Sequence, residues 1–255
     1  MQKIPVKTKE EIKKIIDGGK RLSEIKHFLE EDVKIGVSAW EIEELAISLI
    51  KKTGGEAAFA RVPKYNWATC INVNEGVVHG IPKKDLIFKK GDVVSVDIGL
   101  FFAGFNTDTS FSKGLDVDEP TKSFLNAGRN TLENAIACAV VGARIYDISQ
   151  TIEKSLARSG FNPVKTLVGH GVGRNLHEEP QIPQFIYQDR LKTPEIPEGA
   201  VLAIEIIYSM GDGSIKHEKD GWTIVTGDGK ISALNEDTVI VTKSGPLVVT
   251  RYNQA

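Results

Sequence analysis

Two stretches of the chain decide its fold: Lys90-Gly-Asp-Val-Val-Ser-Val-Asp97-Ile98 and Glu198-Gly-Ala-Val-Leu-Ala-Ile-Glu205-Ile206. Each is an apolar strand pattern with one acid in the same place, and 108 residues separate the two acids. Farther upstream in each half, Gly36-Val-Ser-Ala-Trp40 and Gly142-Ala-Arg-Ile-Tyr146 open similar helical patterns, 106 residues apart. Because both matches fall at nearly one offset, we predict a tandem duplication of an α+β half. Chance similarity between two buried strands is the alternative.

The order of helices followed by strands occurs twice along the chain. Helical periods cover residues 8–33 and 38–52, and then residues 119–140 and 146–158. Ser38 with Glu41 predicts a helix N-cap, and Gly54 predicts a stop. Short β-type runs fill residues 57–111, and the chain closes with strands at 238–242 and 247–250. We therefore predict one domain over residues 1–255, with halves of roughly 8–115 and 116–250.

The composition is that of an ordinary globular chain with balanced charge. The chain carries 32 basic and 34 acidic side chains, so it lacks the basic excess expected of a nucleic-acid binder. The N-terminus shows no signal-peptide pattern, and no apolar run of about 18 residues predicts a membrane span. Cys70 and Cys138 do not form a CxxC pair. We expect a cytoplasmic protein whose chemistry rests on carboxylates and histidines.

Asp97 and Asp108 flank an expected hairpin turn at Ala103–Gly104. A two-residue turn places Asp97 opposite Ser110 and makes Asp108 its diagonal neighbour on the same face, with Cα atoms roughly 7–8 Å apart. A carboxylate within a buried strand is costly unless it is paired or binds a metal, which applies to Asp97 and also to Glu205. Asp108 taken alone is equally compatible with an exposed turn acid.

Three histidines and a further acid extend this set. His170 lies in a glycine-rich loop that permits close approach of a ligand, and His177 follows within Leu176-His-Glu-Glu-Pro180. His79 alone is compatible with a simple turn residue. Glu236 alone is compatible with an exposed acid at the mouth of the 238–242 strand.

Asp97, Asp108, His170, Glu205 and Glu236 together form an oxygen-rich set of ligands with one imidazole and no sulfur. Such a set suits Mn, Fe(II), Co or Zn in a reactive site rather than a structural zinc. Five ligands, four of them carboxylates that can bridge, exceed what one ion needs from protein. The natural interpretation is a site for two divalent metal ions.

Several motifs are specific through their joint order and spacing: Val73-Asn-Glu-Gly-Val-Val-His79-Gly-Ile-Pro82, Asp97-Ile-Gly99, Asp108-Thr-Ser110, Gly169-His-Gly-Val-Gly-Arg-Asn-Leu-His177-Glu-Glu-Pro180, Ala203-Ile-Glu205, Asp220-Gly-Trp222-Thr223 and Glu236-Asp-Thr-Val-Ile-Val-Thr242. With them, the chain resembles the methionine aminopeptidases of the bacterial type I form from its first helix to its final strand. The resemblance implies the α+β pita-bread (creatinase/aminopeptidase) fold. In that fold, two pseudo-symmetric halves surround an antiparallel sheet with helices on its outer face.

The same resemblance implies a ligand arrangement. Asp97 would chelate one ion, Asp108 and Glu236 would bridge both ions, and His170 and Glu205 would complete the other. The implied activity is removal of the N-terminal initiator methionine from nascent proteins and peptides when the second residue is small. A hydroxide held by the two cations would be the nucleophile.

Further roles follow from the resemblance. Glu205 would relay a proton to the leaving amine, His177 would stabilise the oxyanion, and His79 would hydrogen-bond the scissile amide nitrogen. The expected residues around the methionine side chain are Cys70, Trp222, Phe59, Tyr65 and Leu176. The implied partners are nascent polypeptide N-termini. A monomer is expected, and docking at the ribosome is expected from the substrate rather than from any sequence feature.

Three positions depart from the family pattern: Ile206 replaces a usual proline, Asp237 a usual histidine, and Val78 a usual cysteine or alanine. None removes a ligand, but each is expected to affect the pocket wall or the rate. Two alternatives stay open. One is an Xaa-Pro aminopeptidase or prolidase, which shares the fold but normally carries an extra N-terminal domain. The other is a non-catalytic peptide-binding relative.

Overall fold

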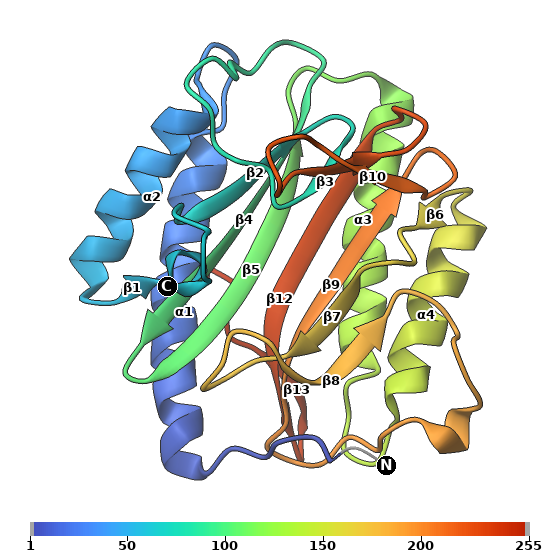
Figure 1. Cartoon of the computed structure of the whole chain (residues 1–255). Coiled ribbons are helices and arrows are strands. Elements are labelled where there is room, and N and C mark those ends of the chain that lie inside the picture. Colours follow the sequence, from blue (N-terminus) through green and yellow to red (C-terminus); the bar gives the residue numbers. More distant parts are fainter. Residues whose placement is uncertain (1–2, 253–255) are drawn as a thin grey trace.

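The computed structural model describes residues 3–252 of the chain. A large, mainly antiparallel sheet forms one layer, and helices cover one of its faces (Figure 1). The main sheet has the order β1–β4–β5–β12–β9–β7–β8, with β2 paired to β4, β6 to β9 and β13 to β12. These strands are β1 (Glu56–Ala57), β2 (Thr69–Val73), β4 (Val93–Phe102), β5 (Phe105–Gly114), β6 (Asn162–Pro163), β7 (Val168–Gly171), β8 (Glu178–Pro183), β9 (Val201–Ser209), β12 (Ser232–Thr242) and β13 (Gly245–Val248).

A smaller sheet of three strands lies at one end of the main sheet (Figure 1). It pairs β10 (Ile215–His217) with β11 (Ile224–Thr226), and β11 with β3 (Gly76–Val78). Two short 3₁₀ helices, η1 (Phe59–Arg61) and η2 (Arg190–Lys192), lie in the connections. No helix among residues 3–252 is long and apolar enough to cross a membrane.

The helices begin and end largely where the sequence predicts. Thr8 caps α1 (Lys9–Asp32), and Ser38 with Glu41 forms the predicted capping box of α2 (Ala39–Thr53). Gly54, in the left-handed region with φ of 75°, ends α2 as expected. The prediction of residues 146–158 corresponds to α4 (Ile145–Arg158).

The third helix is shorter than predicted. Helix α3 (Glu119–Ala137) ends three residues before the predicted limit of 140. Cys138 caps the helix, and Ala139 leads to the β-branched Val140 and Val141 and then to Gly142, which adopts a positive φ of 84°. The apolar pattern in the sequence therefore continues beyond Ala137, but the backbone there is no longer helical.

The hairpin between β4 and β5 has the predicted register. Ala103 and Gly104 form its two-residue turn with φ of 51° and 90°, values that match the twist of an antiparallel hairpin. Asp97 is accordingly opposite Ser110, and Asp108 is opposite Gly99 on the same face. The two acids of the first half are thereby fixed as diagonal neighbours.

Strand β12 corrects the sequence prediction. It begins at Ser232, six residues before the predicted strand, and lies in the centre of the sheet between β5 and β9. The early part reads Ser-Ala-Leu-Asn-Glu-Asp, whose polar residues hide the strand pattern. Glu236 is therefore a buried mid-strand residue and not an acid at the mouth of a strand. The last strand also begins earlier than predicted, at Gly245.

Each part of the sheet packs against its own helix pair. Leu22 of α1 and Ile42 of α2 join one core cluster with Ile98 of β4, whereas Phe124 of α3 and Ile148 of α4 belong to another. Fully burying such a side chain stabilises the fold by about 1.5–3 kcal/mol. Because the helices occupy one face, the opposite face of the central strands is available for a site.

Candidate metal centre

A row of side chains crosses the sheet on the face opposite the helices. Neighbouring strands pair Cys70 with Asp97, Asp97 with Ser110, Ser110 with Glu236, and Glu236 with Glu205. Directly opposed residues of antiparallel strands point to the same face. The register alone therefore brings together three acids from β4, β12 and β9.

Asp108 and His170 extend the row by one diagonal step. Asp108 lies two residues before Ser110, and His170 on β7 is opposite Ala203, two residues before Glu205. One ligand atom each from Asp108, His170 and Glu236 lies within 4.8 Å of the others, an arrangement that could hold a metal ion. His170 Nε2 is 4.0 Å from Asp108 Oδ2.

The backbone orients the His170 ring. Its Nδ1 lies 2.9 Å from the carbonyl oxygen of Gly171, which requires Nδ1–H to donate. Nε2 then keeps its lone pair and faces the acids. This is the usual way in which a second partner fixes the tautomer of a metal-binding histidine.

The acids of the row raise one another's proton affinity. Burial raises the pKa of Asp97 to about 7. Burial and the charges of neighbouring carboxylates also raise the pKa values of Asp108, Glu205 and Glu236 well above their usual range. Burial, with the neighbouring His177 ring as a smaller cause, lowers the pKa of His170 to about 3. An ionised form of this cluster therefore requires positive charge from elsewhere.

No lysine or arginine within residues 3–252 forms an ion pair with Asp97, Asp108, Glu205 or Glu236. The buried Oδ1 of Asp97 has no hydrogen-bond partner in the described part of the chain. A buried acceptor without a donor is rare in native proteins and calls for an explanation such as an ion. The oxygen-rich donor set fits divalent cations.

A cavity of about 610 Å³ opens above this cluster, and the five candidate ligands lie in its lining. Beside them is a mainly apolar wall that includes all five residues predicted to surround a methionine side chain: Phe59, Tyr65, Cys70, Leu176 and Trp222. The Tyr65 and Trp222 rings meet edge to face at 5.0 Å between centroids. The cavity thus combines a polar floor with an apolar side pocket.

His79 and His177 also line the cavity. His79 follows β3 with a φ of 58°, a conformation that turns the chain sharply beside the pocket. The His177 ring meets the His170 ring at 4.5 Å between centroids. Burial lowers the pKa of His79, with His177 and His217 as further causes, and burial lowers that of His177. Both imidazoles are therefore neutral near pH 7.

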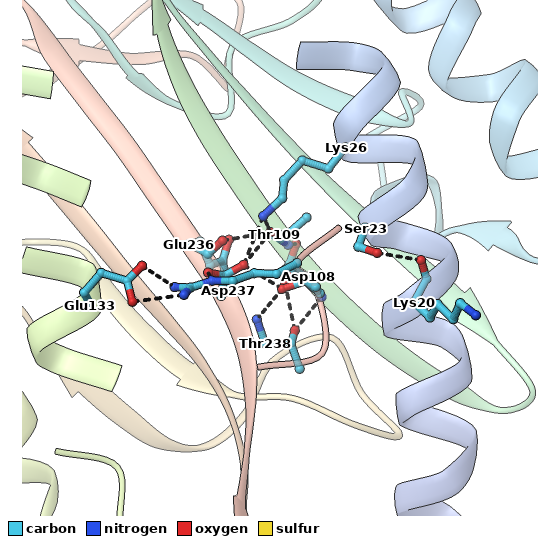
Figure 2. A network of polar contacts seen from close by, with 11 residues as sticks. Lys20, Ser23, Lys26, Asp108, Thr109, Glu133, Glu236, Asp237 and Thr238 are labelled. Carbon is cyan, nitrogen blue, oxygen red and sulfur yellow. Dashed lines mark hydrogen bonds and ion pairs between the residues drawn. The ribbon is translucent and has the colours of Figure 1, made fainter. Parts of the chain in front are cut away.

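The opposite face of β12 carries a different network, shown in Figure 2. Asp237 accepts hydrogen bonds from Lys26 Nζ on α1 at 3.0 Å and from Arg251 Nε at 2.8 Å. Thr109 donates to the carbonyl oxygen of Glu236 at 2.8 Å, and its backbone N–H donates to Asp108 Oδ1 at 3.1 Å. The network therefore supports the strand segments that carry two candidate ligands.

The geometry separates the three departures from the family pattern by their distance from the cavity. Asp237 lies on the helix side of β12, and Ile206 is fully buried in the core cluster that contains Phe124. Neither residue is in the cavity lining, whereas Val78 is. Of the three departures, only Val78 can alter the pocket wall by direct contact.

Several lining residues were not identified from the sequence. Thr166, Leu167, Gln181 and Ile207 join the cavity, as do Val62, Val168, Glu178 and Glu179. Ile207 could have been found, because it follows Glu205 by two residues on the same strand face. Val168 gave a similar signal, because it precedes His170 by two residues on β7, and Gln181 is opposite His170 on β8. The remaining residues lie in loops or at the irregular start of β8.

The comparisons with known proteins agree with this geometry. A family model described as metallopeptidase family M24 matches residues 14–243. A methionine aminopeptidase from Aquifex aeolicus is 36% identical over 254 residues, covering 97% of this chain and 98% of that protein. The structure of a methionine aminopeptidase from Thermotoga maritima has a TM-score of 0.94 at 37% identity, covering 98% of this chain and 100% of that one.

A more distant structure shares the fold alone. A prolidase from Pyrococcus furiosus has a TM-score of 0.77 at 22% identity, and the match covers 98% of this chain but 66% of that chain. The predicted α+β pita-bread fold is confirmed by these neighbours.

Proposed function

The chain belongs to metallopeptidase family M24, and from this premise we propose that it is a methionyl aminopeptidase. It removes the N-terminal initiator methionine from nascent proteins and peptides whose second residue is small. The observation that carries the proposal is a buried cluster of metal-type ligands beside an apolar pocket in one cavity. Relatives named methionine aminopeptidase, which this chain matches over nearly their full length, support the same activity.

We propose that the donor set binds two divalent cations, with Mn, Fe(II), Co and Zn as chemically suitable ions. Asp97, Asp108, His170, Glu205 and Glu236, which all line the cavity, would hold these ions. Four carboxylates carry the charge that two divalent cations balance, and their buried positions otherwise disfavour ionisation. When bound, such ions supply a water of lowered pKa as a nucleophile near neutral pH.

Glu205 is the residue placed to move a proton. Its carboxyl faces the cavity from the centre of β9, and burial together with the charge of Asp97 raises its pKa, so that its carboxylate binds a proton readily. A carboxylate there can take a proton from water and pass it to the amine that leaves the scissile bond.

The two neutral imidazoles serve as hydrogen-bond partners rather than as charges. His177 would donate to the developing oxyanion, and His79 would hydrogen-bond the scissile amide nitrogen. A neutral ring can donate or accept at either nitrogen, whereas a charged ring can only donate.

The apolar pocket selects the first residue. Phe59, Tyr65 and Cys70 are nearly fully buried and form one cluster, against which Leu176 and Trp222 pack. An unbranched thioether side chain fits such a wall of aromatic and sulfur-containing groups. We propose that these five residues bind the methionine side chain.

Residues 1–255 would act as one catalytic domain built from duplicated halves, near 8–115 and 116–250. A substrate that is a nascent polypeptide N-terminus would place the protein in the cytoplasm, in contact with chains that leave the ribosome. Within the halves, β4 and β9 supply Asp97 and Glu205 at equivalent positions on either side of β5 and β12.

The test uses the full chain stripped of metal and then supplied with Mn or Co. The peptides Met-Ala-Ser and Ala-Pro serve as alternative substrates. We expect methionine release from the first peptide only when metal is present. Cleavage before proline alone would support the Xaa-Pro hydrolase instead, and no turnover with any ion would support a non-catalytic relative.

A further inference from the structure

The segment Ile4–Lys7, here called the N-terminal strap, lies ahead of α1 and crosses the same end of the sheet as the β7–β8 connection (Figure 1). Val6 forms a bridge with Ala200, and the Lys7 N–H donates to the carbonyl oxygen of Gly199 at 2.9 Å. Ile4 is 7% exposed and joins the core cluster of the second helix pair. The strap is therefore fixed by both backbone and core contacts.

The Lys7 side chain points inward from this strap. Its Nζ lies 2.5 Å from Glu178 Oε2, and the two side chains are 6% and 9% exposed. The lysine stem passes over Gly173, where an added Cβ would lie 2.4 Å from Lys7 Cε. A side chain at position 173 would therefore displace the Lys7–Glu178 pair from its present place. Removing one partner of a buried ion pair leaves the other charge uncompensated.

Glu178 uses both carboxylate oxygens to hold one turn. Oε2 accepts from Lys7, and Oε1 accepts from the backbone N–H of Asn175 at 3.0 Å. His177 lies within this turn, directly before Glu178. On its other side, Leu176 packs against the cluster that forms the apolar pocket. The position of His177 is thus set by one neighbour in the pocket and one neighbour tied to Lys7.

We propose that Lys7 is a positioning residue that aims His177 at the reacting group through the Lys7–Glu178 ion pair. The inference rests on the proposed function, because it gives His177 its role in peptide cleavage. Lys7 itself is neither a candidate metal ligand nor a residue of the cavity lining, although its partner Glu178 lines the cavity. The effect of Lys7 should therefore reach the reaction through Glu178, and we expect His177 to carry it.

The experiment compares Lys7→Met, His177→Ala and the double variant with the unaltered full chain, each loaded with Mn. Methionine release from Met-Ala-Ser gives kcat and KM, and calorimetric titration gives the metal affinity. We expect Lys7→Met to lower kcat on the order of tenfold, because small displacements of a catalytic group are costly. Its metal affinity should stay within about twofold of the unaltered chain. In the His177→Ala background, Lys7→Met should have almost no further effect on kcat.

Two further variants control for the loss of an ion pair on the same loop and for unfolding. Arg174→Gln removes the exposed pair of Arg174 with Glu11 on the same loop, 2.6 Å between nitrogen and oxygen, and should leave kcat within about twofold. If Lys7→Met unfolds, Lys7→Met combined with Glu178→Gln removes the uncompensated charge and takes its place in the comparison.

The proposal is overturned if kcat survives the loss of Lys7, if the losses from Lys7→Met and His177→Ala add in full, or if metal affinity falls with kcat. Failure of the proposed function is a separate result. In that case, the unaltered chain itself would release no methionine.

Discussion

Glu236 and Asp237 are adjacent in the sequence, yet they belong to two different regions of the molecule. They point to opposite faces of β12, as the alternation of a strand requires. Both are 3% exposed. Asp237 meets Lys26 and Arg251 on the helix side, whereas Glu236 meets other carboxylates on the cavity side.

The role of a buried acid can be inferred from the charges of the residues around it. Asp237 is neutralised by Lys26 of α1, as Figure 2 shows, and by Arg251, so it stabilises the contact of β12 with α1 and with Arg251. Glu236 is surrounded by like charge, which only an external cation can relieve. The following predictions test whether that division holds.

The largest expected effect is on catalysis at Glu236. Glu236→Ala should lower methionine release by more than about a thousandfold, because one ligand shared by the two proposed metal ions is lost. The same variant should leave the metal-free chain at least as stable as before, since a repelled buried carboxyl has been removed. Kinetics and denaturant unfolding of the two metal-free chains measure both quantities. A metal-free Glu236→Ala chain that unfolds more easily would contradict the division between the two faces.

The next effect concerns His79, which lines the cavity but is not a candidate ligand. His79→Ala should lower kcat by about a hundredfold, since one positioned hydrogen bond to the reacting group is removed. Metal binding, measured by calorimetry, should be unchanged. Near-normal turnover in this variant would show that His79 has no catalytic role.

On the helix side, the expected loss is one of stability. Asp237→Ala leaves Lys26 and Arg251 without their shared partner and should cost about 3 kcal/mol of the free energy of unfolding. Glu133→Gln is the matched control. It breaks the more exposed contact with Arg251 and should cost less than about 1 kcal/mol. Equal losses of the free energy of unfolding in both variants would show that Asp237 does not stabilise the helix side of β12.

The effect that is smallest per step of the measurement is the pH dependence of the metal-free chain, which is spread over several pH units. The folded-state pKa of Asp97 is raised to about 7, above its unfolded value of about 3.9, so the folded chain binds the extra proton between these values. Asp97 therefore removes stability as pH rises through that window, on the order of 1 kcal/mol per pH unit. The lowered pKa of His170 acts with the opposite sign below about pH 6.5, so the comparison must be made between variants.

The matched variant for this test is Asp97→Asn. Unfolding curves from pH 4 to 7 should show its stability advantage over the unaltered chain growing with pH. Added Mn should reverse the order, because only the unaltered chain keeps the full donor set. A constant difference across the range would show that Asp97 is not strained by burial.

Much of the site was predictable because it follows from strand register. The turn at Ala103–Gly104 fixed Asp97 and Asp108 as diagonal neighbours, and the duplicated strand pattern pointed to Glu205. Glu236 was harder, because the polar run of β12 conceals a central strand whose two faces bind different charges.

Long-range pairs lie beyond sequence reasoning of this kind. Lys7 and Glu178 are 171 residues apart, and neither belongs to a periodic pattern that predicts their contact. The partners of Asp237 come from α1 and from the chain after β13. The observation that Asp237 stands where the family usually has a histidine therefore did not predict these partners. Such contacts arise from packing of whole elements.

The number and place of the bound ions can be measured in a crystal structure of the full chain with Mn, analysed by anomalous scattering. We expect two ions in the cavity, both in contact with Asp108 and Glu236, one also with Asp97 and the other with His170 and Glu205. A single ion held by one half of the chain, or ions bound only outside the cavity, would contradict this expectation.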